Sequence, residues 1–317
     1  MSFISTFHSY PLKRIYPYIF ITIADTIIWR LILYHRKKIN KLLIFLHNHA
    51  NPPIKASLSR FHILVVNLIF QAICLAPIFA AGVFASRALK VQSHLDFWTF
   101  SYGIPYDIFA LPVSFNGGYT YYRICIETPL LIAFSVYLLL HHYGLLLLQF
   151  NNALKSVDLI TVPSRCLEIS NTYNRIEEKL RVLIKILSVP LFIIMLISFF
   201  NLYTALVFYL QVQDVPSFVL PEIYISASAG AAIICSLTLC CSKIPKYILE
   251  IKTTAGVLIN KSVTKALKNE KDIHLLRGIE KSDILYFSAC GMVQFQKSLL
   301  LSSFGTFFTY ALLIENN

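Results

Sequence analysis

Long apolar runs separated by basic segments constrain this chain more than any other feature of its sequence. A helix that crosses a lipid bilayer needs about 20 consecutive, mostly apolar residues. Inside lipid the backbone must satisfy its own hydrogen bonds, so such runs are expected to be helices. The sequence therefore predicts an all-α, multi-pass membrane protein with one transmembrane domain over residues 1–317 and about six spans. The expected spans are 16–34, 63–84, 129–148, 186–211, 219–241 and 298–314.

The composition excludes the main classes of soluble protein. Hydrophobic residues make up 56% of the chain and charged residues only 14%, whereas soluble domains have about 25% charged residues. The net charge is +12, which in a soluble protein would suggest nucleic-acid binding. Here the basic residues lie in blocks between the apolar runs, as in proteins that are oriented in a membrane. Nucleic acid is therefore not expected as a partner.

The segments between the apolar runs alternate in charge. Those at 35–62, 149–185 and 242–297 are rich in lysine and arginine, whereas the loop expected at 85–128 is balanced and the loop 212–218 has no basic residue. Basic loops remain in the cytoplasm. The alternation predicts an extracellular C-terminus in the plasma membrane, and an even number of spans places the N-terminus of this chain outside as well.

Two of the basic loops are long enough to contain helices. Residues 174–185 hold neither proline nor glycine and include the i,i+4 pair Glu177 and Arg181, so this stretch is expected to extend the following membrane helix. Residues 244–262 have apolar positions at helical spacing, and a second basic amphipathic stretch lies at 272–285. Two interpretations remain open: helices that lie on the lipid headgroups, or a packed cytoplasmic bundle that holds subunits together.

No pattern of catalytic or metal-binding residues occurs in the sequence. The glycine-rich phosphate loop, His-Glu-x-x-His and Gly-x-Ser-x-Gly are all absent. His141 and His142 are adjacent, so on a helix they point about 100° apart and favour hydrogen bonding over shared metal ligation. The seven cysteines show no zinc-like spacing. We therefore expect no enzymatic activity, no cofactor and no metal.

Polar residues inside the apolar runs are costly in lipid and indicate positions that face protein. Asp25 is the most unusual, and either faces the interior of the helix bundle or lies in a partly interfacial segment. Asn67 and Gln71 share one helix face and are expected to bond to a neighbouring helix. Asn201 and Phe208 share a face in the outer half of their span, where helix–helix contact is favoured over contact with a ligand.

The last apolar run ends in the most specific pattern of the chain. Thr309-Tyr310 is followed by the five residues Ala311–Glu315 and then by Asn316. This pattern resembles the last span of arthropod gustatory receptors, which ends in Thr-Tyr, five mostly hydrophobic residues and Gln. Two positions depart from it: an acidic residue fills the fifth of the five positions, and Asn replaces Gln. With the long basic loops, the resemblance extends from about Tyr16 to the end.

The resemblance implies a seven-helix chemoreceptor with a cytoplasmic N-terminus, an extracellular C-terminus and four subunits around one central pore. Counting back from the Thr-Tyr pair, the six apolar runs match spans two to seven, and a first span is not recognisable in this sequence. The implied function is a subunit of a tetrameric ligand-gated cation channel, opened by a small-molecule tastant or odorant. Its partners would be the ligand, the lipid bilayer and identical or related subunits.

The resemblance also implies the residues that line the pore. It places a hydrophobic gate at Leu313 and a polar ring at Asn316. Thr309, Leu313 and Asn316 have the spacing of one helix face, and Tyr310 points away from it. Outer-half aromatic and amide residues are the candidates for the ligand pocket, and these are Tyr137, Asn201, Phe208 and Tyr224.

Two other classes of membrane protein remain as alternatives. A G-protein-coupled receptor would need a cytoplasmic C-terminus, opposite to the charge pattern, and neither Asp-Arg-Tyr nor Asn-Pro-x-x-Tyr occurs. A small-molecule transporter would favour internal repeats and helices broken by glycine and proline at matching positions. Pro77 and Pro190 are not so placed. The identity of the ligand does not follow from the sequence.

Overall fold

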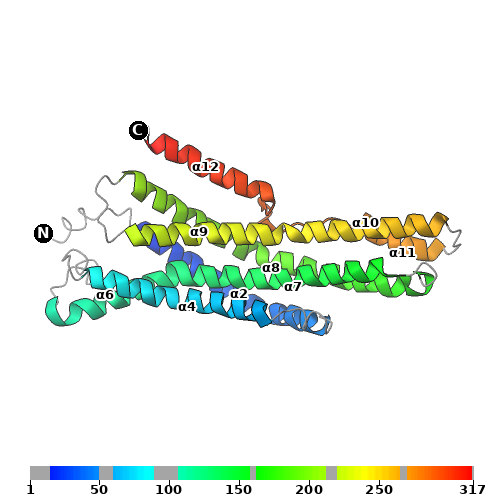
Figure 1. Ribbon diagram of the computed structural model, residues 1–317, viewed down its shortest axis with the longest axis horizontal. Helices are drawn as coiled ribbons and strands as arrows, with labels where there is room; N and C mark the ends of the chain where they lie inside the picture. Colours follow the sequence, from blue (N-terminus) through cyan, green and yellow to red (C-terminus); the bar gives the residue numbers. More distant parts are fainter. Residues whose placement is uncertain are drawn as a thin grey trace.

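The computed structural model describes residues 15–49, 60–88, 106–157, 162–211, 220–264 and 270–315. Long helices run side by side along one axis, and within these ranges almost all residues are helical (Figure 1). This is the expected solution for a chain in lipid, because a helix satisfies its backbone hydrogen bonds within a single segment. The all-α, multi-pass fold predicted from the sequence is therefore present.

The N-terminal half contributes three long helical segments, the third of them interrupted by a π-helix. The elements are α2 (Ile15–His49), α4 (Arg60–Ala88), α6 (Tyr106–Tyr122), the π-helix η2 (Arg123–Glu127) and α7 (Thr128–Lys155). Helix α6 passes through η2 into α7 without a break. The chain from Leu111 to Lys155 is thus one continuous rod of 45 residues.

The helix α6 corrects the expectation of a loop at 85–128. This segment contains Pro112 and the pair Gly117-Gly118, which are poor helix formers in isolation. In the fold α6 packs along α4 and continues into η2, so tertiary contact and helix continuity outweigh the local preference. A purely local reading of the sequence could not include that contact.

The C-terminal half is dominated by α8 (Val162–Gln211), a single helix of 50 residues. The prediction that residues 174–185 extend the following membrane helix is therefore confirmed. After α8 the elements are α9 (Leu220–Cys241), α10 (Lys243–Thr264), α11 (Glu270–Lys281), β1 (Ser288–Ala289), β2 (Val293–Gln294) and α12 (Lys297–Glu315). The two short strands form a hairpin, the one β-sheet in the described ranges.

Four helical stretches within the described residues are long and apolar enough to cross a membrane. They are Ile63–Val83, Leu111–Lys155, Arg165–Leu206 and Ile223–Ser262. The expected spans 16–34 and 298–314 lie within α2 and α12, and neither helix is among these four. In α2 the apolar run is interrupted by Asp25 and Arg30.

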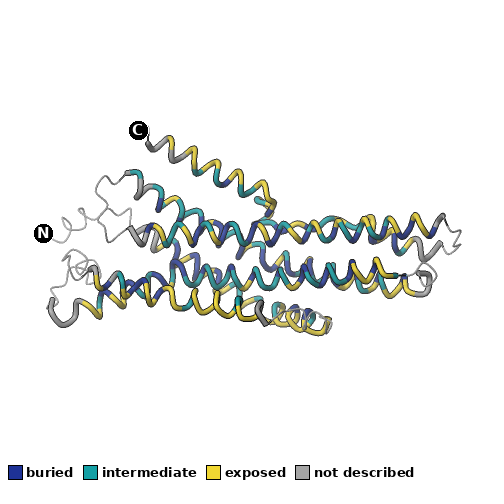
Figure 2. Tube along the Cα trace, viewed as in Figure 1, coloured by how far each residue is buried: buried dark blue, intermediate teal, exposed yellow. Residues whose placement is uncertain are grey.

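At one end of the molecule the last part of α7, the first part of α8, α10 and α11 pack together; we call this the distal bundle. The apolar face of α10, with Ile248, Ile251 and Ala255, is buried against α7 and α11 (Figure 2). A Cβ on Gly144 of α7 would lie 3.0 Å from the Tyr247 ring, so glycine permits this close approach. The face of α10 is therefore covered by protein, as the packed-bundle interpretation requires.

Candidate functional site

The last helix, α12, stands apart from the rest of the structure. Figure 1 shows it leaning away from the other helices, with the end of the chain farthest from them. It contacts α8 and α9, and the rings of Phe199 and Phe307 stack at 6.0 Å. Leu301 and Phe308 are 80% and 71% exposed. A single chain therefore leaves much of the apolar surface of α12 uncovered.

Of the residues expected to line a pore, Thr309 is described in full. Its side chain is exposed, and its hydroxyl donates to the carbonyl of Gly305 at 2.9 Å, as is usual for a threonine within a helix. Tyr310 and Leu313 lie in α12, but their side chains are outside the described part, and Asn316 lies beyond the described residues. Their roles remain predictions.

Residues 282–296, which we call the connector, join α11 to α12. They contain a short hairpin that sequence reasoning missed. Strand β1 pairs antiparallel with β2, with Ala289 opposite Val293. Cys290 and Gly291 have φ of 53° and 73°, and the amide of Met292 donates to the carbonyl of Ala289 at 2.9 Å. Two successive positive φ angles are typical of a type I′ turn, and glycine adopts them readily whereas cysteine does so at a cost of about 1 kcal/mol. Apolar residues that alternate on both sides of a Cys-Gly pair were the available signal.

The hairpin is fastened to the middle of α8 at Ser188. The Ser188 hydroxyl donates to the carbonyl of Ser288 at 3.1 Å and accepts from the amide of Cys290 at 3.0 Å. Two residues later comes Pro190, which has no amide hydrogen and disturbs the regular helix at this level. The chain that leads into α12 therefore bonds directly to a locally weakened position of α8.

Two buried aromatic rings anchor the same hairpin. Phe287 and Phe295 are each 1% exposed, and the amide of Phe295 donates to the carbonyl of Phe287 at 3.0 Å. Burying a phenylalanine stabilises by roughly 1.5–3 kcal/mol. The connector is therefore held by packing as well as by hydrogen bonds, and can transmit displacement between α8 and α12.

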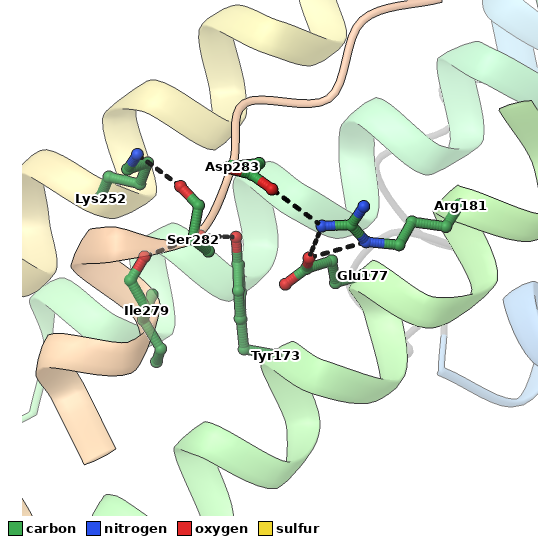
Figure 3. A network of polar contacts seen from close by, with 7 residues as sticks. All are labelled: Tyr173, Glu177, Arg181, Lys252, Ile279, Ser282 and Asp283. Carbon is green, nitrogen blue, oxygen red and sulfur yellow. Dashed lines mark hydrogen bonds and ion pairs between the residues drawn. The ribbon is translucent and has the colours of Figure 1, made fainter. Parts of the chain in front are cut away.

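A polar network holds the beginning of the connector, where α11 ends (Figure 3). The hydroxyls of Tyr173 and Ser282 lie 2.8 Å apart, and Lys252 donates to the carbonyl of Ser282 at 2.6 Å. Burial raises the pKa of Tyr173 above its ordinary value, so the phenol remains neutral. Ser282 is thus bonded to α8 through Tyr173 and to α10 through Lys252.

The Glu177–Arg181 pair predicted from the sequence is confirmed in this network. The closest approach of the two side chains is 2.6 Å, and Arg181 also lies 3.8 Å from Asp283, the residue after Ser282. The hydrogen bond that Arg181 donates to Glu177 is the main cause that raises the pKa of Arg181. Arg181 is about half exposed, so solvent keeps the energy of the pair small.

A cleft of about 460 Å³ lies between α8 and α12. Its lining is mostly apolar and includes Phe192 and Phe199 of α8, Val293 of the hairpin and Phe307 of α12. Ser303 also lines the cleft, is 7% exposed, and its hydroxyl has no hydrogen-bond partner among the described residues. The cleft shows that α12 is not fully packed against its own chain.

Asn201, a candidate for the ligand pocket, makes a contact between helices. Its side-chain amide is buried and donates to the carbonyl of Cys125 in η2 at 3.5 Å. A Cβ on Gly230 of α9 would lie 2.8 Å from the backbone carbonyl of Ser198, so α8 and α9 are in close contact at the same level. The structure thus supports the helix–helix interpretation of Asn201.

The other pocket candidates lie apart from Asn201. Tyr137 is half-buried on α7 next to His141, about 18 Å along the helical rod from Cys125 at 1.5 Å per residue. Tyr224 is 62% exposed on α9, and the side chain of Phe208 is not described. The geometry therefore separates Tyr137 from Asn201, and the place of the Phe208 side chain stays untested.

The remaining polar residues of the predicted spans differ in how far they are buried. Asp25 is 9% exposed on α2, and neither carboxylate oxygen has a hydrogen-bond partner in the described part, so it faces the bundle interior. Asn67 and Gln71 are exposed on α4 and make no hydrogen bond to another described helix, which corrects the expectation that they join two helices of one chain. No group of three metal-ligating residues occurs among the described residues.

Comparison with known proteins identifies the fold but no closer relationship. No protein-family model matches the sequence, and no similar curated protein was found. The structure is similar to that of the insect olfactory receptor OR5 from Machilis hrabei, with a TM-score of 0.68 and 11% identity over 92% of this chain and 78% of that chain. The structure of OR5 in complex with eugenol gives 0.65 and 11% identity over 94% and 80%. The chain therefore has the all-α, multi-pass membrane fold of the insect olfactory receptor OR5.

Proposed function

We propose that this protein is a subunit of a tetrameric chemosensory cation channel of the gustatory-receptor type, located in the plasma membrane and opened by a small-molecule tastant or odorant. The observation that carries the proposal is the isolation of α12 in a chain with the fold of an insect olfactory receptor. The C-terminal Thr309-Tyr310 pattern in the same helix supports the gustatory type.

The exposed apolar surface of α12 calls for partners other than its own bundle. Leu312 is 60% exposed, and most of the other apolar residues on this side of the helix are exposed as well. Four copies of α12 around one axis would cover this surface and enclose a path for ions. A ring of Leu313 side chains would exclude water in the closed state, because hydrophobic constrictions gate by dewetting. Thr309 and Asn316 would provide polar rings on either side.

The connector offers a physical route from ligand binding to the gate. A ligand opens a channel only by binding the open arrangement more tightly than the closed one. Movement of α8 would reach α12 through Ser188 and the hairpin, which bond at 3.0–3.1 Å. The distal bundle, held by the Tyr173–Ser282 contact, would be cytoplasmic and would serve as the fixed end.

The ligand would bind in the outer half of the helices and would be mostly apolar with a few polar groups. Tyr224 and Phe208 remain our candidates for direct contact, with Tyr137 and Asn201 as secondary ones. Asn201 already bonds to Cys125, so its replacement would act through the packing of α8 on η2. Alanine at Tyr224, which is 62% exposed, should shift the dose–response without loss of surface expression.

The decisive experiment replaces Leu313 by Ser in the full chain and records whole-cell current. Loss of the apolar ring should raise the basal cation current severalfold. The matched control is Leu312→Ser, one residue away and about 100° around the helix. Leu312 lies on the surface that other subunits would cover, so current is normalised to surface expression, and the normalised basal current of this variant should be unchanged. Equal leak from both variants, or surface expression of both without any leak, would reject α12 as the lining of the pore. External epitope labelling after Asn317, and its absence at residue 265, tests the orientation separately.

A further inference from the structure

Helix α2 carries a dense basic surface that the proposed channel does not use. Its exposed basic residues are Arg30, Arg36, Lys37, Lys38 and Lys41. The sequence holds no Asp or Glu between Asp25 and Asp96, and none of the ion pairs among the described residues involves α2. This surface therefore has no neutralising partner in the described part of the chain.

Contacts between helices place these charges at one depth. The rings of Phe20 on α2 and Phe200 on α8 stack at 5.1 Å, so the two residues lie at one level. At about 1.5 Å per residue, Arg36 lies about 24 Å beyond Phe20, and Lys185 lies about 22 Å from Phe200 in the same direction. Both are exposed. The two helices therefore present basic side chains together, where the hydrocarbon core of about 30 Å gives way to headgroups.

A groove on α2 leads toward this level from the membrane side. It has a volume of about 550 Å³ and lies on one face of the helix. Its lining residues are Thr26, Ile27, Arg30, Leu31, Leu33 and Tyr34. Ile27 is 46% exposed and Tyr34 is 81% exposed, so the groove opens to the surroundings of the helix. The groove is apolar except for the guanidinium group of Arg30 and the phenol of Tyr34 at its end. Such a lining fits an amphipathic ligand.

The positive charge of Arg30 determines which class of ligand fits the groove. It lies about 9 Å on the membrane side of Arg36 at 1.5 Å per residue, within the apolar part of α2. An arginine at such a depth is costly unless a counter-charge accompanies it. A guanidinium pairs with phosphate through two parallel hydrogen bonds. A phospholipid supplies that phosphate together with acyl chains for the apolar residues of the groove.

We propose that this face of α2 binds an anionic phospholipid of the cytoplasmic leaflet. Arg30 pairs with the phosphate, Ile27 and Leu31 contact an acyl chain, and Tyr34 lies at the interface, where its ring and hydroxyl suit the headgroup region. The basic run from Arg36 to Lys38 attracts the net negative charge of the headgroup. The site requires that α2 crosses the membrane with Arg36 toward the cytoplasm, and it stands or falls independently of the channel function.

The test is native mass spectrometry of the full chain in detergent, with phosphatidylserine or phosphatidylcholine added. Wild type should retain phosphatidylserine at least fivefold more tightly than phosphatidylcholine. Arg30→Gln should weaken phosphatidylserine binding about fivefold, the effect of one basic charge near an anionic surface, and Arg30→Lys should restore part of it. The matched control is Arg165→Gln, since Arg165 is exposed at the far end of α8 and should leave binding unchanged.

Three results would overturn the proposal: equal retention of the two lipids, equal loss in Arg30→Gln and Arg165→Gln, or displacement of the lipid by soluble glycerophosphoserine at the same concentration. The last result would indicate a site for the headgroup alone. If Arg30→Gln does not fold, the exposed pair Lys37→Gln/Lys38→Gln replaces it, with an expected loss of about 25-fold. Retention of wild-type binding by that pair would count equally against the site.

Discussion

The distal bundle and α12 belong to one chain but differ in how much of their apolar surface is buried. In the bundle, Leu183 of α8 and Ile251 of α10 are 0% exposed, whereas Leu301 and Phe308 of α12 are among the most exposed apolar residues. Figure 2 shows buried residues where the bundle helices face each other and mostly exposed residues along the described part of α12. The bundle therefore covers its apolar surface within one chain, whereas α12 leaves much of its own apolar surface exposed. In the proposed channel, other subunits would cover that surface. The hairpin that bonds to Ser188 connects the distal bundle to α12, and we call this connection the joint.

The largest effect is expected from a charge inside the bundle. Ile251→Asp places a carboxylate where the side chain is fully buried, at a cost of several kcal/mol without a partner. We expect loss of the monodisperse peak in size-exclusion chromatography and loss of surface expression. Thr253→Asp, two residues away and exposed, is the control and should behave as wild type. A well-folded Ile251→Asp protein would show that the bundle is not the stable part of the molecule.

An intermediate effect is expected at the joint. Ser188→Ala removes the donor to Ser288 and the shorter of the two bonds of the Cys290 amide, which also donates to the backbone carbonyl of Ser188 at 3.3 Å, a loss of about 1–2 kcal/mol. Hydrogen exchange of the Cys290 amide should accelerate about tenfold, while the melting temperature of the bundle stays within about 2 °C. The ligand concentration for half-maximal current should change as well, because α8 and α12 become less tightly coupled.

The control for the joint is Ser236→Ala. Ser236 is half-buried on α9, and its hydroxyl bonds only within its own helix, to the carbonyl of Ile233. Exchange of the Cys290 amide should be normal in this variant. If Ser188→Ala leaves that exchange unchanged too, the Ser188 hydroxyl does not hold the hairpin. The bond from the Cys290 amide to the Ser188 carbonyl and the packing of Phe287 and Phe295 then suffice.

The smallest effect is expected from the exposed ion pair of the bundle. Arg181→Gln removes the contacts with Glu177 and Asp283, but Arg181 is about half exposed, so solvent screens the pair and the loss should be below about 1 kcal/mol. Thermal unfolding in detergent should shift by no more than about 4 °C and should converge with wild type in high salt. A larger shift would mean that charge, rather than apolar packing, stabilises the bundle.

The all-α, multi-pass fold and the helical extension at 174–185 were accessible from the sequence because their signals are local, whereas the bounds of the six spans stay predictions. Apolar length, the absence of proline and glycine, and the i,i+4 spacing of Glu177 and Arg181 depend only on neighbours in the chain. The segment at 106–122 was missed because Pro112 and Gly117 obscure its helical character, and contact with α4 supplies what propensity does not.

The candidate site could be predicted from the sequence only in part. The pore positions Thr309, Leu313 and Asn316 follow from a short motif and helix geometry, and the resemblance gave them their roles. The pocket candidates were chosen by residue type and presumed depth. The structure separates Tyr137 from Asn201 because Asn201 bonds to Cys125, and Tyr137 lies twelve residues beyond Cys125 along a continuous helix. Residue type does not convey this distance.

The sequence by itself determined that this chain is an all-α protein that spans a membrane several times, because hydrophobic length acts locally in lipid. That its basic loops share one side stays a prediction from charge placement. Only the tertiary structure decided that α12 stands free, that Ser188 holds the hairpin and that Ser282 is bonded to both α8 and α10. These contacts join residues far apart in the sequence. Their existence depends on how whole helices pack, and packing is a property of pairs of surfaces rather than of any one segment.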